Sequence, residues 1–381
     1  MSDVQADLDV AIVHDWFPTI AGGEKVVKEI MHCFPKSEIY TVFDFLSDEE
    51  RRSFFGDRPV HVSDLNRLPG VERYYRYLLL QATRAIEALD VTRHEAVISS
   101  SAALSKGVIT GPEQKHFAYI HSPARYAWDL THEYMLSLNG FAASLKRALA
   151  REMMHRFRIW DMRTVAQVDY MIANSYFIKK RIWKTYRRNA DVIYPPVDTD
   201  AFTKSEAPRG DFFFTASRMV PYKNIHLIVE AFSQRPDLKL IVCGDGPEMG
   251  RIKAMAKGNV EFLGHAPFEV MRDHMQRARA FVFAAKEDFG IVPVEAQACG
   301  TPVIALGQGG TAETVRGLDH AAPTGVHFHT QTTVDLLIAV SQFEAVETEL
   351  RSETIVAHAK AFGSDRFRGE LTSYIQERLP G

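Results

Sequence analysis

Two glutamates in the carboxyl-terminal half lie eight positions apart and enclose a short apolar segment. Glu287 and Glu295 flank the sequence Asp-Phe-Gly-Ile-Val-Pro-Val. A carboxylate accepts hydrogen bonds from sugar hydroxyls, and free N–H groups at a helix start bind phosphate oxygens. The pair therefore suits a ligand that carries both hydroxyls and phosphates. A capped helix with one solvated glutamate explains the same spacing equally well.

The segments around this pair predict where each glutamate lies. Residues 280–285 form a short apolar run that is typical of a buried parallel strand. Pro293 suits the first position of a helix that ends at Gly300, and residues 303–306 predict the next strand. Glu287 is then expected in the loop after one strand, and Glu295 in the first helical turn. Ligands bind at this edge of open α/β sheets.

Two cations follow another predicted strand of the same half. Arg218 and Lys223 come after the apolar residues 212–215. An arginine chelates phosphate oxygens and a lysine adds a mobile point charge, so the two are suited to a diphosphate and to the charge of a leaving group. Two solvated loop cations are the alternative interpretation.

The first half offers weaker signals of the same kind. Gly22-Gly23 follows the predicted strand 10–14, but the dinucleotide-binding fingerprint needs a third glycine where this chain has Val26. The glycine pair still permits close approach of the backbone to a ligand, although a plain turn is as consistent. His121 ends the predicted strand 115–120, where it can bind a sugar or stabilise charge, or be a bystander.

Two segments combine basic and apolar residues. Residues 71–80 mix tyrosines with arginines, and residues 141–160 place five cations among Leu, Met and Phe. Such helices can lie in an anionic membrane surface. Buried helices whose cations extend to the solvent have the same pattern.

Composition narrows the class of protein. The net charge of −3 over 381 residues argues against a nucleic-acid-binding protein, and the three cysteines have no metal-binding or disulfide spacing. The polar amino terminus is no signal peptide, and no apolar run is long enough to span a membrane, so we expect a cytoplasmic protein. Asp198 and Asp200 follow a proline pair, which favours capping over metal binding.

Strands and helices alternate along the whole chain, which predicts an α/β fold. Further strands are expected at 96–99, 170–173, 238–243 and 260–263, and residues 225–232 have the spacing of an amphipathic helix. The prolines at 195 and 196 interrupt the alternation. Two doubly wound domains joined near residue 197 are the prediction.

Several segments, each weak alone, form a joint pattern. They are Gly22-Gly-Glu24, His121, residues 172–175 and 192–198, Arg218 with Lys223, residues 242–247, and residues 287–295. Together they resemble the retaining glycosyltransferases of family 4, whose GT-B fold has two Rossmann-like domains facing a central cleft. Residues 121–126 and 287–290 are most similar to bacterial mannosyltransferases of polysaccharide and O-antigen assembly.

The resemblance implies a role for each candidate residue. His121 and Glu287 would lie at the transferred sugar as catalytic residues, and Glu295 would bind the ribose hydroxyls. The remaining donor-binding residues would be Gly22, Gly23, Arg218, Lys223, Asp288, Phe289, Gly290 and Ile291. The residues expected to face the acceptor or the membrane are Asp15, Arg125, Lys146, Arg147 and Arg151.

The resemblance also implies a reaction. A hexose, which is mannose from GDP-mannose in the subgroup, would be transferred with retention of the anomeric configuration and without a metal or other cofactor. The acceptor would be a polyprenyl-diphosphate-linked saccharide at the inner, anionic face of the membrane. Residues 1–196, completed by a final helix at 363–381, would bind the acceptor, and residues 197–362 the donor. A UDP-sugar donor, or an epimerase or hydrolase of sugar nucleotides, uses the same scaffold. A non-catalytic binding protein would normally carry an export signal.

Overall fold

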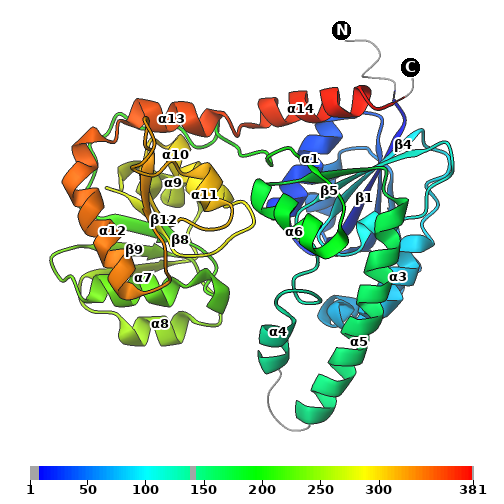
Figure 1. Ribbon diagram of the computed structural model, residues 1–381, viewed down its shortest axis with the longest axis horizontal. Coiled ribbons are helices and arrows are strands. Elements are labelled where there is room, and N and C mark those ends of the chain that lie inside the picture. Colours follow the sequence, from blue (N-terminus) through cyan, green and yellow to red (C-terminus); the bar gives the residue numbers. More distant parts are fainter. Residues whose placement is uncertain (1–7, 138–142, 380–381) are drawn as a thin grey trace. The chain divides into compact units, whose positions relative to one another are not determined.

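The computed structural model describes residues 8–137 and 143–379 (Figure 1). The chain divides into two compact units. The first comprises Met1–Tyr194 and Phe367–Gly381, and the second comprises Pro195–Arg366. The divisions therefore fall after residues 194 and 366, close to the proline pair and within the last helix.

The first unit contains a parallel sheet of seven strands in the order β3-β2-β1-β4-β5-β6-β7. The four predicted strands are present, while β2, β3 and β7 were not predicted. The strands are β1 Val10–Phe17, β2 Glu38–Asp44, β3 Val60–Val62, β4 Ala96–Ser101, β5 Lys115–Ile120, β6 Tyr170–Ala173 and β7 Asp191–Val192. Burial on both faces gives most of them continuous apolar runs instead of an alternating pattern.

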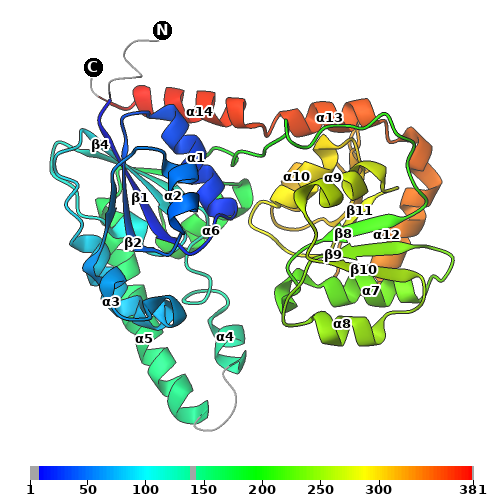
Figure 2. The ribbon, with the colours of Figure 1, turned by 180° about the vertical axis from the view of Figure 1, so that it is seen from behind.

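Helices cover both faces of this sheet (Figure 1, Figure 2). They are α1 Gly22–Cys33, α2 Asp48–Phe55, α3 Leu79–Glu87, α4 Thr131–Ser137, α5 Ala143–Thr164 and α6 Tyr176–Tyr186. The final helix, α14 (Ser364–Gln376), packs Phe367, Leu371 and Ile375 into the core that α1 and β1 also fill. Arg368 pairs with Glu29 of α1 at the edge of this contact.

The second unit has a parallel sheet of six strands in the order β10-β9-β8-β11-β12-β13. Only β13 was not predicted. The strands are β8 Phe213–Ala216, β9 Leu240–Cys243, β10 Val260–Gly264, β11 Phe281–Phe283, β12 Val303–Leu306 and β13 Gly325–Phe328. Strand order reverses between β8 and β11, which is the switch point where doubly wound sheets bind ligands.

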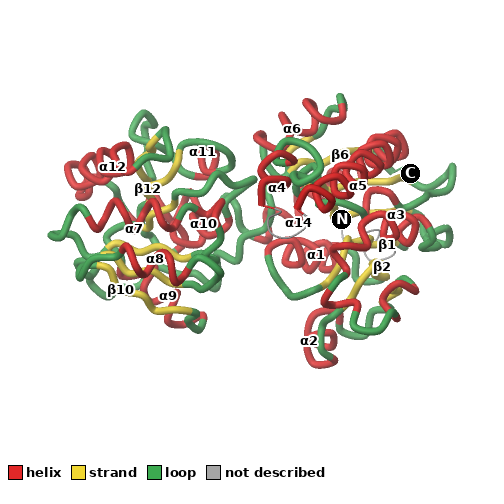
Figure 3. Tube along the Cα trace, turned by 90° about the horizontal axis from the view of Figure 1, so that it is seen from below, coloured by secondary structure: helices red, strands yellow, loops and turns green. Residues whose placement is uncertain are grey.

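Helices surround this sheet as well (Figure 3). They are α7 Ile225–Ser233, α8 Met249–Met255, α9 Phe268–Arg277, α10 Ile291–Ala298, α11 Thr311–Thr314, α12 Thr333–Val346 and α13 Ser352–Lys360. The predicted amphipathic helix at 225–232 is therefore present as α7. The apolar faces of α7 and α12 meet the strands in one continuous core that includes Phe213, Phe232 and Phe343.

Two local predictions were wrong. Helix α10 begins at Ile291, so Pro293 is its third residue, where its missing N–H group still costs no helical hydrogen bond. Glu295 is then the fifth residue and lies beyond the first turn. Residues 71–80 form no single helix: two short 3-10 segments, Val71–Arg73 and Tyr75–Leu78, precede α3. The predicted basic segment 141–160 coincides with α5, although residues 141 and 142 lie outside the described part of the chain.

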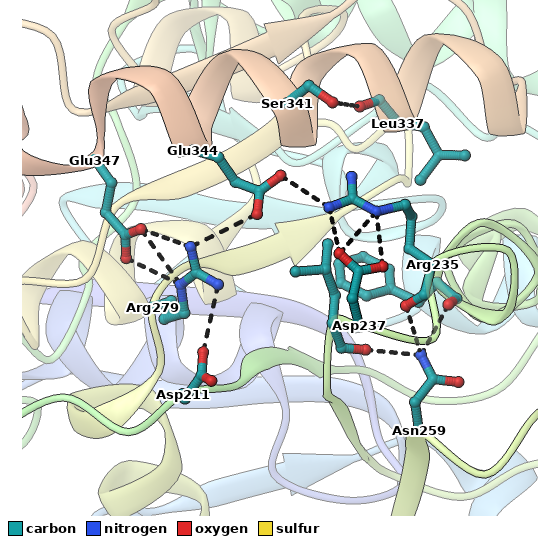
Figure 4. A network of polar contacts seen from close by, with 11 residues as sticks. Asp211, Arg235, Asp237, Asn259, Arg279, Leu337, Ser341, Glu344 and Glu347 are labelled. Atoms are coloured by element: carbon teal, nitrogen blue, oxygen red, sulfur yellow. Dashed lines mark hydrogen bonds and ion pairs between the residues drawn. The ribbon is translucent and has the colours of Figure 1, made fainter.

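A polar network joins α12 to the amino-terminal ends of β8 and β11 (Figure 4). Arg279 donates to Glu347 in bidentate fashion, with Nη2 at 2.7 Å and Nε at 3.1 Å, and also contacts Asp211. Arg235 pairs with Asp237 at 2.7 Å and with Glu344 at 3.2 Å. These residues lie at the edge of the sheet opposite the carboxyl ends of the strands, so we assign the network to stability.

We predict that Arg279→Ala lowers the free energy of unfolding by about 2 kcal/mol, because a half-buried, bidentate charge pair is lost. The control Arg277→Ala removes a more exposed pair with Asp273 and should cost less than about 0.5 kcal/mol. Urea unfolding measures both. Equal losses in the two variants would contradict the assignment.

Candidate functional site

Close backbone packing positions Arg218 at the carboxyl end of β8. A Cβ atom on Gly244 would lie 1.9 Å from the carbonyl oxygen of Ser217, and one on Gly246 would lie 2.5 Å from that of Met219. The Met219 N–H donates to the Asp245 carbonyl at 2.8 Å. The glycines after β9 thus hold the backbone on both sides of Arg218 in place. The Arg218 side chain is exposed and makes no ion pair or hydrogen bond with the described residues.

A second glycine pair packs on the loop that carries Glu287. The Gly310 N–H donates to the Glu287 carbonyl at 2.8 Å, and a Cβ on Gly310 would approach the Phe289 backbone to 2.2 Å. A Cβ on Gly309, whose φ is +75°, would lie 2.5 Å from the Glu287 carbonyl oxygen. Sequence reasoning missed these glycines. Their signal was the one used for Gly22-Gly23, a glycine pair after a predicted strand.

Lys223 and Glu287 form an ion pair with Nζ and Oε1 2.5 Å apart. Each side chain is 19% exposed, so both remain within reach of a ligand. We had expected them to contact different parts of one ligand, and the structure brings the two groups together. An anion that binds Lys223 must compete with this carboxylate. The affinity of Lys223 for an anion therefore depends on the charge of Glu287.

The start of α10 brings the other predicted residues to the same strand ends. Gly290, with φ +90°, precedes the helix, and Ile291 is its first residue. Glu295 is only 4% exposed and Phe289 only 3%, with the Phe289 ring packed 5.7 Å from that of Phe362. Asp288 is half-buried in the preceding loop. The first N–H groups of α10 have no acceptor inside the helix, which gives this end a positive potential.

In the first unit, a cluster of polar groups surrounds Gly23. A Cβ on Gly23 would lie 3.7 Å from the His14 ring and 3.8 Å from that of His121. Ser100 Oγ lies 2.7 Å from Nε2 of His121 and 3.2 Å from Nδ1 of His14. Gly22 and Gly23 are the first residues of α1, so the helix start faces this cluster.

Electrostatics fixes the charge state of two members of this cluster. Burial, with a smaller contribution from the charge of His14, lowers the pKa of His121 to about 4, so its imidazole is neutral near pH 7. Burial alone would raise the pKa of Glu24. The hydrogen bond to His14, the charge of His14 and hydrogen bonds from two backbone N–H groups outweigh this effect, so the pKa of Glu24 is lowered. A neutral imidazole beside a carboxylate offers hydrogen bonds without adding positive charge.

Asp15 holds the loop after β4. Its two oxygens accept the backbone N–H groups of Ala102, Ala103, Leu104 and Ser105 at 2.6–2.8 Å. The next residue, Lys106, pairs with the buried Asp161 of α5. Both side chains of this ion pair are almost inaccessible. Asp15 is itself 2% exposed, a structural role that our sequence reasoning did not include; acceptor contact by Asp15 stays a prediction.

Four basic residues were predicted for the acceptor or membrane side, and three of them lie on α5. Lys146 and Arg151 are exposed on α5 and Arg147 is half-buried there. Large apolar side chains share this exposed surface: Leu145, Leu149 and Ile159 are 61%, 63% and 60% exposed. Arg125 is half-buried in the loop after β5.

The described residues contain neither a membrane-spanning helix nor a cluster of metal-binding side chains. No helix there has both the length and the apolar character to cross a membrane. No cluster of three or more His, Cys, Asp or Glu side chains there can hold a metal ion. Asp198 accepts the Ala201 N–H at 3.0 Å in the turn after the proline pair.

Comparison with known proteins matches residues 197–358 to the family described as Glycosyl transferases group 1. A GDP-mannose-dependent monoacylated alpha-(1-6)-phosphatidylinositol monomannoside mannosyltransferase of Corynebacterium glutamicum is 37% identical over 26% of this chain and 30% of its own length. The O-antigen chain mannosyltransferase RfbU of Salmonella typhimurium is 30% identical over 39% of this chain and 45% of its own. The chain spans 42% of the length of a Mycobacterium D-inositol 3-phosphate glycosyltransferase, at 28% identity.

Solved structures show the same fold over nearly the whole chain. Anabaena Alr3699/HepE in complex with UDP has a TM-score of 0.70 and covers 97% of this chain and 100% of its own, at 16% identity. The GT-B fold implied by the sequence resemblance, with two parallel-sheet α/β domains, is thereby confirmed.

The Lys223–Glu287 pair generates a first prediction. Glu287→Gln removes the charge that competes for Lys223, so GDP should bind about fivefold more tightly, the equivalent of about 1 kcal/mol. Titration calorimetry measures this, with Glu269→Gln on α9 as a control that should leave the affinity unchanged. Unchanged or weaker GDP binding by Glu287→Gln would show that the Lys223–Glu287 pair is not part of the anion site.

The neutral state of His121 generates a second prediction. The unfolded chain binds a proton at this histidine below about pH 6.5, whereas the folded chain does not until about pH 4. Stability therefore falls as the pH falls through this window. His121→Gln should lose less stability between pH 7.5 and 5.0 than the parent in urea unfolding, and the exposed-site control His32→Gln should lose as much as the parent. Identical losses in all three proteins would show that His121 titrates normally.

Proposed function

We propose, from the match of residues 197–358 to the group 1 glycosyl transferases, that the chain is a retaining glycosyltransferase. It transfers a hexose, mannose from GDP-mannose, to a lipid-linked saccharide during cell-surface polysaccharide synthesis. Two mannosyltransferases among the similar proteins support this choice of sugar. One of them is named as GDP-mannose-dependent and as acting on a lipid.

The observation that carries the proposal is the meeting of Arg218, Lys223, Glu287 and the start of α10 at one sheet edge. Arg218 makes no ion pair or hydrogen bond with the described part of the chain, and Lys223 exchanges its carboxylate partner for the donor diphosphate. Glu287, released from Lys223, then accepts hydroxyls of the hexose. Glu295, the fifth residue of α10, takes the ribose hydroxyls, while the backbone of residues 288–291 lines the sugar and phosphate.

The chemistry asked of these groups is charge stabilisation. Departure of the nucleoside diphosphate leaves an oxocarbenium-like sugar and places negative charge on the leaving phosphate. Arg218, Lys223 and the positive end of α10 stabilise that phosphate. The acceptor hydroxyl attacks the face that the diphosphate leaves, so the configuration is retained with no covalent glycosyl-enzyme intermediate. The leaving group's charge is neutralised by side chains, and the proposal includes no metal or other cofactor.

The first unit supplies the acceptor side in this proposal. Neutral His121 donates a hydrogen bond to the transferred sugar without repelling its developing positive charge. Gly22 and Gly23 leave the backbone at the start of α1 open to a phosphate of the substrate. The exposed apolar and basic surface of α5, which carries Leu145, Lys146 and Leu149, rests on an anionic membrane and brings the enzyme to its lipid-linked acceptor.

We predict that GDP-mannose raises the melting temperature more than UDP-glucose does, and that Lys223→Ala removes most of this shift because the diphosphate loses its mobile cation. Differential scanning fluorimetry measures both effects. Lys257→Ala, at an exposed lysine of the same unit, is the matched control and should keep the full shift.

Transfer of radiolabelled mannose to lipid-linked saccharide in membrane extracts completes the test. Labelled lipid product supports the proposal, and Lys223→Ala should reduce its formation at least a hundredfold. Equal shifts with both donors would contradict the choice of GDP-mannose, and interconverted free sugar nucleotide would indicate an epimerase.

A further inference from the structure

A cavity of about 590 Å³ lies within the first unit, separate from the cluster around His121. Its walls come from the end of β1, from residues 72–82, from Tyr126 and Tyr134, and from α5. The volume falls within the usual range for small-molecule sites. None of the roles described so far uses this cavity.

The interior of the cavity is mainly apolar. Leu79 and Met154 are 6% and 2% exposed, and Met153 is half-buried beside them. Trp16 and Tyr75 form one aromatic wall, with ring centroids 5.8 Å apart. Methionine and leucine side chains adapt to flexible aliphatic chains, and the apolar part of the cavity surface exceeds the polar part. The interior therefore fits a branched or linear hydrocarbon.

Two arginines flank this apolar interior. Arg73 is exposed and has no polar side-chain partner among the residues described. Arg76 donates through Nε to the Tyr75 hydroxyl at 3.1 Å and lies over the Tyr75 ring, which leaves its outer nitrogens for another acceptor. Glu72 is the carboxylate of the same lining, so the net charge of the three is +1. Two guanidinium groups beside a hydrocarbon pocket match a phosphate or diphosphate on an apolar chain.

Two tyrosines of the lining differ in their exposure. Tyr126 lines the cavity, and its buried hydroxyl has no hydrogen-bond partner among the residues that the structure describes. Asp15, which immediately precedes Trp16, acts electrostatically on both Tyr126 and His121. At the other side, Tyr77 is a lining residue that is 77% exposed. The lining thus includes a buried tyrosine hydroxyl and an exposed aromatic side chain.

We propose that this cavity binds the isoprenoid chain of a phosphate-bearing lipid acceptor, with Arg73 and Arg76 on its phosphate. The inference rests on the proposed glycosyl transfer to a lipid-linked saccharide and names the site that selects the lipid. The isoprenoid packs against Leu79, Met153 and Met154, and Tyr77 contacts the chain where it leaves the protein. An acceptor held in this way presents its saccharide from a fixed anchor.

Titration calorimetry of the full chain with farnesyl diphosphate, farnesol and inorganic diphosphate tests the proposal. Farnesyl diphosphate should bind at least tenfold more tightly than either of its halves. The double variant Arg73→Ala/Arg76→Ala should weaken farnesyl diphosphate at least tenfold while leaving farnesol unchanged. Met153→Trp, which fills the cavity from a half-buried position, should weaken farnesyl diphosphate and farnesol alike.

Two controls separate this site from other diphosphate sites. Arg84→Ala, at an exposed arginine of α3 outside the lining, should keep full affinity for farnesyl diphosphate. Lys223→Ala should also keep it, because that lysine belongs to the second unit. Three results would each overturn the proposal. They are full affinity for farnesyl diphosphate in Arg73→Ala/Arg76→Ala, loss of this affinity in Lys223→Ala, and equally tight binding of inorganic diphosphate. Failure of GDP-mannose to bind would instead overturn the donor assignment and leave these lipid results standing.

Discussion

The candidate donor site depends on loops that pack backbone against backbone where parallel strands end. Gly244 lies against Ser217, and Gly309 and Gly310 lie against residues 287–289, all too closely for a side chain. Their contacts fix the loops that carry Arg218 and Glu287, and the second loop leads directly into α10. The charged side chains then need little reorganisation to meet a ligand, which is the condition under which fixed charges stabilise a transition state effectively.

A different constraint organises the first unit. The Asp15 carboxylate accepts four consecutive backbone N–H groups, and the loop so fixed continues into Lys106, which is paired with Asp161. Trp128 and Tyr186 also donate to Asp161, at 2.7 and 2.9 Å. A buried pair with this many hydrogen bonds avoids the large penalty of an isolated charge. It connects the strand ends to α5, the helix whose other face carries exposed leucines and cations.

The sequence was sufficient for much of this arrangement because parallel strands buried on both faces leave short, continuous apolar runs. Strands such as β5 and β12 were predicted for that reason, and so was the position of Glu287 after a strand. Residues 38–44 escaped notice because their sequence, Glu-Ile-Tyr-Thr-Val-Phe-Asp, mixes polar and apolar side chains although nearly all are buried. The predicted start of α10 was wrong because proline is tolerated throughout the first turn, so Pro293 does not mark one position.

Pairings between distant residues could not be predicted from local patterns. Nothing near Lys223 in the chain indicates that it meets Glu287, and Asp15 shows no local sign of its four backbone partners nearly ninety positions away. The glycine pair at 309–310 did carry a local signal, but its meaning depends on residues 287–289, which only the fold brings near. Local signals therefore located the strand ends, while the charges that meet there required the three-dimensional structure.

A crystal structure of the protein with GDP-mannose tests the central claim most directly. We predict the donor diphosphate within hydrogen-bonding distance of Arg218 and Lys223, the ribose hydroxyls on Glu295, and Glu287 separated from Lys223 and bound to the hexose. A sugar nucleotide bound away from these residues, or an intact Lys223–Glu287 pair beside a bound donor, would contradict the account.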